Sequence, residues 1–290
     1  MKLHKQFGNK KYGKSSIYAV LFAFFVFGTF CILLILKDPG IFFTREDTNF
    51  FVPHDPNTVY RISSTVNSFW ALDGSGNLLN KDGLPKHEQR DYELTASIIP
   101  SRTAFIIMDP WIDAPSEFLN HYYNKIIEAK ILPLTEKAIS LGHPVFILTN
   151  NPQEFDYSAT IHAEFENLAE NGNIKVLYHQ DYDADSFSAF LKGHKIHSLI
   201  YTGFASNMCV IGREMGMIPM KNLNFRLFFI PEASAAVELA DTWESQEIHK
   251  STTSIISQWI AQIIHYDDFM AIKKPAAQDN QKLAENGTYK

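Results

Sequence analysis

The predicted fold rests on one segment, "LIYTGFASNMCV" at residues 199–210, in which an apolar run ends at a glycine and leads to a cysteine. A short apolar run bounded by a turn signal is typical of a buried strand, and the residues from Asn207 to about Met217 favour a helix. Cys209 therefore lies where a helix begins after a strand. Two interpretations stay open: a reactive thiol at the turn, or a small apolar residue that fills a crowded core.

Similar apolar runs lie on both sides of this segment and alternate with amphipathic stretches. Such alternation predicts an α/β fold, a doubly wound parallel sheet in three Rossmann-like layers, with helices on both faces. In chain order, the five expected strands cover 103–109, 144–150, 174–179, 197–203 and 225–231. The expected helices cover 116–142 with an interruption near Pro133, then 153–170, 185–194, 207–217 and 244–264.

This architecture predicts where chemistry occurs. In open doubly wound sheets, sites form at the carboxyl ends of the strands, where the strand order reverses. With the order 3-2-1-4-5, the reversal lies between the first and fourth strands. Asp109 ends the first strand and Cys209 follows the fourth, so we expect the two side chains to face each other. The alternative for Asp109 is a solvated carboxylate at a strand end.

The start of a helix gives a thiol a physical reason to be reactive. With an ordinary pKa near 8.5 a cysteine is only a few per cent thiolate at pH 7, and a fall of about two units needs roughly 2.7 kcal/mol. Free N–H groups and the helix dipole supply part of that, and the same N–H groups can hold an oxyanion. The position predicts a pKa of Cys209 well below 8.5.

Composition excludes some partners. The chain has 290 residues and a net charge of −6, so nucleic acid is not expected to bind. Its two cysteines are Cys31 and Cys209. Because Cys31 lies in a long apolar run near the N-terminus, we expect no disulfide between them and a free thiol at Cys209.

That apolar run, residues 17–36, has no charged residue and is about twenty residues long, enough to cross a bilayer as one helix. The preceding residues 1–16 are basic, and the positive-inside rule puts them in the cytoplasm. No A-x-A-like cleavage site follows, which favours an uncleaved anchor over a signal peptide. We therefore expect a single-pass protein of the cell membrane with its main domain extracytoplasmic. The basic residues are Lys2, Lys5, Lys10, Lys11 and Lys14.

The remaining chain divides into three parts. Residues 37–100 form a lead-in whose alternating polar and apolar residues around "DGSGN" predict a strand or hairpin that wraps the main domain. Residues 101–270 form that main domain. Residues 271–290 are polar and low in large apolar residues, which predicts a disordered tail.

Four stretches in this order, "TAFIIMDPW", "GHPVFILTN", "LIYTGFASNMCV" and "FFIPEASAA", carry a family resemblance. From about residue 100 to 270 the chain resembles the isochorismatase-like cysteine hydrolases, which include nicotinamidases and N-carbamoyl amide hydrolases. The resemblance implies that Cys209 is the nucleophile and Asp109 the general base. It also implies a cis peptide between Phe204 and Ala205, with the amides of Ala205 and Cys209 forming an oxyanion hole.

The chain departs from this family at the third catalytic position, where the family has a lysine at the end of the third strand. Here the strand ends with His179, while Lys175 lies earlier in it. We expect His179 to replace the lysine and to lie near the Cys209 sulfur. Glu232 also stands where the family commonly has aspartate.

The resemblance implies no metal or other cofactor, because the Asp-x-His pattern of the metal-binding nicotinamidases does not follow the second strand here. Trp111, close to Asp109, either lines a substrate pocket or packs at the strand end.

Two functions stay open. The first is a membrane-anchored hydrolase that cleaves a C–N bond of a small molecule, of the amide type. The second is a weak or inactive relative that binds a partner outside the cytoplasm. A homo-oligomer is compatible with either function.

Overall fold

The computed structural model describes residues 58–114, 116–154 and 159–273. Among these residues, no helix is long and apolar enough to span a membrane. The predicted spanning segment at 17–36, its basic flank and most of the predicted tail lie outside the described residues. Membrane anchoring therefore stays a prediction.

An eight-stranded sheet forms the centre of the described chain, in the order β4-β1-β10-β9-β8-β5-β6-β7. Neighbouring strands from β10 to β7 run parallel. The order of the five strands expected from the sequence, 3-2-1-4-5, is confirmed: β5 lies between β6 and β8. The parallel strands are β5 (Thr103–Met108), β6 (Val145–Thr149), β7 (Lys175–Tyr178), β8 (Ser198–Phe204), β9 (Arg226–Ala235) and β10 (Gln262–Ile263).

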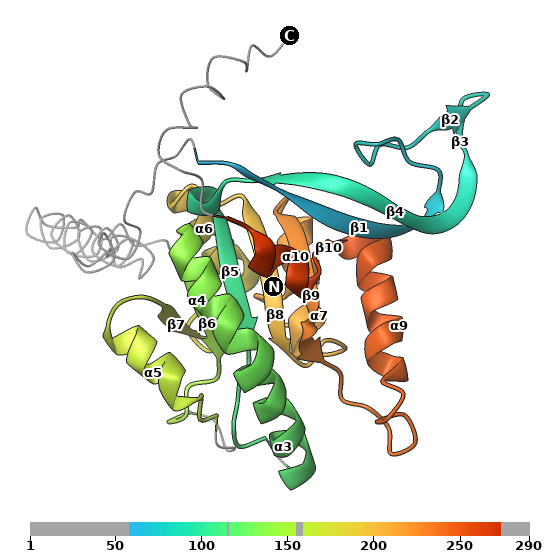
Figure 1. Ribbon diagram of the computed structural model, residues 1–290. Helices are drawn as coiled ribbons and strands as arrows, with labels where there is room; N and C mark the ends of the chain where they lie inside the picture. The colour runs from blue at the N-terminus through green and yellow to red at the C-terminus, as the bar shows by residue number, and fades with distance from the viewer. Residues whose placement is uncertain (1–57, 115, 155–158, 274–290) are drawn as a thin grey trace, which may run out of the picture. The chain divides into compact units, whose positions relative to one another are not determined.

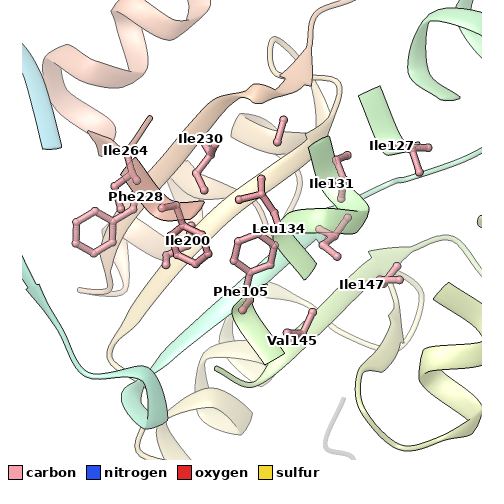
Figure 2. Packing of buried hydrophobic residues seen from close by; sticks show 14 of the residues in the cluster. Phe105, Ile127, Ile131, Leu134, Val145, Ile147, Ile200, Phe228, Ile230 and Ile264 are labelled. Carbon is pink, nitrogen blue, oxygen red and sulfur yellow. The ribbon is translucent and has the colours of Figure 1, made fainter. Parts of the chain in front are cut away.

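One face of the sheet packs against a long helix. This helix comprises α3 (Glu117–Ile126), a π-helical segment (Ile127–Ile131) and α4 (Leu132–Leu141). Phe105, Ile107, Val145 and Ile147 from the strands meet Ile127, Ile131 and Leu134 from the helix, all fully buried (Figure 2). Helix α10 (Tyr266–Ala271) adds Phe269 to this core.

The opposite face carries alternate residues of the same strands, including Ile106, Met108 and Tyr201. They pack against α6, α7, α8 and the segment after α9, which together give the second helical layer. Successive strand residues point to opposite faces, so both layers come from continuous apolar runs, as a buried parallel sheet requires. The helices are α5 (Ala163–Glu170), α6 (Ala184–Gly193), α7 (Cys209–Gly212), α8 (Met217–Asn222) and α9 (Glu247–Ile255).

The lead-in contributes two strands to this sheet. β1 (Tyr60–Trp70) pairs antiparallel with β4 (His87–Ile98) along most of its length and meets β10 at Thr65 and Ile263 (Figure 1). The short strands β2 (Asn80–Lys81) and β3 (Leu84–Pro85) form the far end of this hairpin. At its near end, Tyr60 Oη donates to Nε2 of buried His143 at 2.8 Å, which ties the hairpin to the central domain.

Several helices differ from the sequence predictions. Pro133 does not break its helix; a π-helical turn precedes it instead, because proline cannot donate to the carbonyl four residues earlier. The helix expected from 153 begins only at Ala163, and the one expected over 207–217 is split at Arg213, whose backbone is extended. After α9, a π-helical segment (Ile256–Ile260) is followed by strand β10 rather than by more helix.

Candidate active site

Asp109 directly follows β5 at the carboxyl edge of the sheet and is 3% exposed. Its φ of +43° is in the left-handed region, which aspartate tolerates better than most side chains. The backbone is held on both sides, because Asp109 N–H donates to Leu148 O and Asp109 O accepts from Trp111 N–H, each at 2.8 Å. The sheet therefore fixes where this carboxylate lies.

Cys209 begins α7 after a close approach of β8 to β5. Gly203 has a φ of +94°, and a Cβ there would lie 2.1 Å from Met108 O, so only glycine fits. The peptide between Phe204 and Ala205 is cis, at the position that the family resemblance implies. The strand end of Asp109 and the turn before Cys209 are therefore in direct contact, and the half-buried thiol lies beside the carboxylate.

His179 binds the Asp109 carboxylate, a contact that the sequence did not predict, and its expected position near the Cys209 sulfur stays a prediction. Its Nε2–H donates to Asp109 Oδ1 at 3.0 Å, and both side chains are buried. His179 follows β7 and Asp109 follows β5, so both side chains lie at the carboxyl edge of the sheet, with only β6 between their strands. Lys175 lies earlier in β7, with Nζ 5.7 Å from the centre of the Phe190 ring.

Arg213 is the cation beside the thiol, and the sequence analysis did not identify it. It lies four residues after Cys209, with Nη2 3.8 Å from Asp109 Oδ2, and Nη1 donates to Asn150 Oδ1 at 3.3 Å. A hydrogen bond and the positive charge of Arg213 act to lower the pKa of Cys209. Arg213 lies just beyond α7 with an extended backbone, so no helical spacing in the sequence pointed to this role.

The pKa of Cys209 is raised, whereas its position at the helix start led us to expect a lowered pKa. Burial raises the pKa of Cys209 to about 11, and the charge of Asp109 and a weak hydrogen bond to it add to the rise. Arg213 opposes this rise only in part. The helix has a single turn and its first residues face a carboxylate, so in the resting site the cysteine is a thiol next to a proton acceptor.

Asp109 Oδ2 is well placed to be that acceptor. Among the described residues, this buried oxygen has no hydrogen bond of normal length, since His179 occupies Oδ1. The N–H groups of Ala205 and Cys209 likewise donate to no acceptor within the described part of the chain. These two amides are therefore available to a ligand oxygen, as an oxyanion hole requires.

The turn that carries these amides is fixed from behind by α9. Ser206 Oγ–H donates to His249 Nδ1 at 2.9 Å, and His249 Nε2–H donates to Pro231 O at 3.1 Å. The carboxylate of Glu238 accepts from the N–H groups of Ile248 and His249 at 3.1 and 2.8 Å, and so caps the helix. Burial lowers the pKa of His249, in agreement with a neutral ring.

Tyr123 from α3 closes the site on another side. Its ring stacks on Phe204, with centroids 4.0 Å apart and an interplanar angle of 6°. Burial and the nearby charges of Cys209, Tyr122 and Asp109 raise the pKa of Tyr123, so the phenol is neutral. No sequence signal connects this tyrosine with the cysteine, because only the packing of α3 brings them together.

Trp111 is half-buried and holds two strand ends together. Its Nε1–H donates to Thr149 Oγ1 at 2.7 Å, and its backbone bridges to Ile161.

A cavity of about 460 Å³ lies between β6, β7 and α5, lined by Thr149, Ile161, Val176 and Tyr178 among others, and neither Cys209 nor Asp109 lines it. Within the described residues, no group of three His, Cys, Asp or Glu side chains could hold a metal ion.

Comparisons with known proteins find no matching family model and no matching curated protein. Similar solved structures include isochorismatase-like cysteine hydrolases at low identity. A cysteine hydrolase from Pseudomonas syringae pv. phaseolicola 1448A is 15% identical, with a TM-score of 0.47 over 60% of this chain and 92% of that one. A nicotinamidase from Bacillus subtilis is 17% identical, with a TM-score of 0.45 over 56% and 99%. An isochorismatase from Pseudomonas putida KT2440 is 17% identical, with a TM-score of 0.41 over 57% and 89%.

Proposed function

We propose that this protein is a cysteine hydrolase that cleaves the C–N bond of a small amide. One observation carries the proposal: the Cys209 thiol lies beside an Asp109 carboxylate in which Oδ1 is bound by His179, while Oδ2 accepts no hydrogen bond from the described residues and has Arg213 Nη2 at 3.8 Å. A thiol next to a buried, unsatisfied carboxylate oxygen is the arrangement that a nucleophile and its general base require.

The reaction follows from these positions. The sulfur attacks the amide carbonyl while the thiol proton moves to Asp109 Oδ2, and the resulting oxyanion is held by the N–H groups of Ala205 and Cys209. The tetrahedral intermediate collapses, the amine leaves with the proton from Asp109, and an acyl thioester remains on Cys209. Water that loses a proton to Asp109 then attacks the thioester, which releases the acid and returns the proton to sulfur.

Arg213 and His179 have separate roles in this scheme. Proton transfer in step with attack avoids a free thiolate, which the raised pKa of Cys209 disfavours. Negative charge that develops on sulfur is stabilised by the positive charge of Arg213 beside the thiol. His179 keeps the carboxylate oriented so that Oδ2 faces the thiol, and it acts as a positioning residue.

A second candidate function is that of a binding protein with little or no activity. The observation that favours it is the high pKa of Cys209, since a neutral thiol is a weak nucleophile. We further propose, from the sequence alone, that residues 17–36 anchor the domain to the cell membrane with residues 1–16 in the cytoplasm. We propose that this anchored domain lies outside the cytoplasm.

Ammonia release from a panel of primary amides tests the hydrolase. We expect Cys209→Ser and Asp109→Asn each to abolish release, whereas Cys31→Ser, which changes the other cysteine of the chain, keeps the wild-type rate. If no amide releases ammonia with wild-type protein that is folded by circular dichroism, the binding function becomes the better explanation.

A further inference from the structure

Five large apolar side chains gather around the turn that carries Cys209. Four of them are strongly exposed: Phe118 at 56%, Met208 at 56%, Val237 at 37% and Leu239 at 62%. Trp243, which is half-buried, lies among them. We call these five residues the apolar collar. Contiguous exposed apolar surface commonly marks a ligand or partner site, whereas single exposed residues are ordinary.

One side of the collar is joined to the nucleophile turn by direct hydrogen bonds. Met208 immediately precedes Cys209 in the chain. The side chain of Asn207 binds the backbone of Val237 twice, since Nδ2 donates to Val237 O at 3.2 Å and Oδ1 accepts from Val237 N at 3.0 Å. The segment with Val237 and Leu239 is therefore held against the turn.

The other side comes from α3. Phe118 meets the Trp243 ring edge-on, with centroids 4.7 Å apart, and Tyr122 meets the same ring at 5.6 Å. The next residue, Tyr123, stacks on Phe204 at the base of the turn. The two sides of the collar thus meet where Phe118 contacts Trp243.

The charge around the collar is acidic. Glu117, Asp241 and Glu244 are exposed beside collar residues, and residues 116–123 and 236–244 contain no lysine or arginine. A ligand carboxylate would be repelled at this rim, whereas an uncharged apolar group would bury the collar without that penalty.

We infer that the apolar collar binds an alkyl or aryl group of the substrate, so that the preferred substrates are uncharged amides with a large apolar part. That the preferred substrates are amides rests on the proposed function, whereas the preference for a large apolar group does not. Removal of one collar side chain is expected to weaken the preference about five- to tenfold, from the hydrophobic contribution of a few buried methylene groups.

Alkylation of Cys209 measures the preference without hydrolysis. The thiolate displaces iodide from iodoacetamide or from N-octyl iodoacetamide, and mass spectrometry of the Cys209 peptide gives both rates. For each thiol we compare the alkylation rate with the octyl reagent to the rate with iodoacetamide. We expect this rate ratio to be at least fivefold higher for Cys209 in the full-length protein than for glutathione. Leu239→Ser should remove most of this advantage, whereas Leu84→Ser, which changes a leucine 71% exposed at the far end of the hairpin, should keep it.

Hydrolysis of octanamide and acetamide provides the second readout. We expect a higher kcat/KM for octanamide that falls in Leu239→Ser. An octyl preference in alkylation without hydrolysis of either amide would overturn the proposed function and leave the collar inference standing. If Cys209 showed no preference between the two alkylating reagents, the collar inference would be overturned, whatever the rates of amide hydrolysis. The same result would follow if a second copy of the chain covered the collar.

Discussion

His179 donates a hydrogen bond from Nε2 to Oδ1 of Asp109 over 3.0 Å, and both side chains are buried. Because the ring satisfies one oxygen of the carboxylate, the other oxygen is left without a hydrogen bond from the described residues, with Arg213 Nη2 at 3.8 Å, and the Cys209 thiol lies beside the same carboxylate. In the proposed reaction the two oxygens of this side chain have different roles: Oδ1 fixes the orientation of the carboxylate, and Oδ2 exchanges the proton.

Loss of that hydrogen bond should slow the reaction without removing the base. We expect His179→Ala to lower kcat about tenfold or more, since a charged hydrogen bond contributes roughly 1.5–3 kcal/mol. His197→Ala changes an exposed histidine away from the site and should keep kcat. Amide hydrolysis across pH measures both variants; an unchanged kcat in His179→Ala would contradict the positioning role.

The pKa of Cys209 should respond in opposite directions to its two charged neighbours. Alkylation rates across pH should give a pKa of about 11 for the wild type. In Asp109→Asn the negative charge that disfavours the thiolate is gone, so the pKa should fall. In Arg213→Gln the stabilising cation is gone, so the pKa should rise. A wild-type pKa below 8.5 would show that the helix start outweighs burial and Asp109.

Gly203 should be the least replaceable glycine near the site. In Gly203→Ala the new Cβ would overlap Met108 O at a φ of +94°, so we expect a loss of more than about 3 kcal/mol of stability or no folded protein. Gly172→Ala is the matched control, because φ is +71° there but no atom lies within 4 Å. It should lose only about 1 kcal/mol in urea unfolding. Equal losses in the two variants would contradict the close approach.

His249 should make stability depend on pH. Its folded pKa is lowered by burial from the ordinary 6.5, so the unfolded chain binds the proton more readily. Its contribution is therefore present above pH 6.5 and is lost as the pH falls from there toward the folded pKa. His249→Asn keeps an acceptor for Ser206 and does not titrate, so its thermal midpoint should fall less over this range. The same pH slope in both proteins would assign the effect to other groups.

The order of the central strands and the pairing of Asp109 with Cys209 could be predicted from sequence. Both follow from local patterns: apolar runs of strand length, and the rule that the ends of neighbouring parallel strands meet at one edge. The hairpin of β1 and β4 was indicated by its alternating residues, although its pairing with β10 depends on a two-residue strand that carries almost no signal.

The remaining site residues depend on tertiary geometry. Arg213 reaches Asp109 because α7 ends after one turn, and the sequence predicted a longer helix. His249 and Tyr123 come from helices whose sequences show only an apolar face, and their contacts with Ser206 and Phe204 are set by packing. The raised pKa of Cys209 is likewise a sum over burial and two opposing charges, which no spacing rule supplies.

The proposed function depends on acyl transfer to Cys209, and trapping the acyl-enzyme measures that transfer. Protein mixed with octanamide or benzamide is quenched in acid within milliseconds to seconds, and the Cys209 peptide is analysed by mass spectrometry. We expect an acyl adduct on Cys209 in the wild type, more of it with octanamide than with benzamide, and none in Asp109→Asn. No adduct and no ammonia from either amide, in protein whose Cys209 is still alkylated by iodoacetamide, would contradict it.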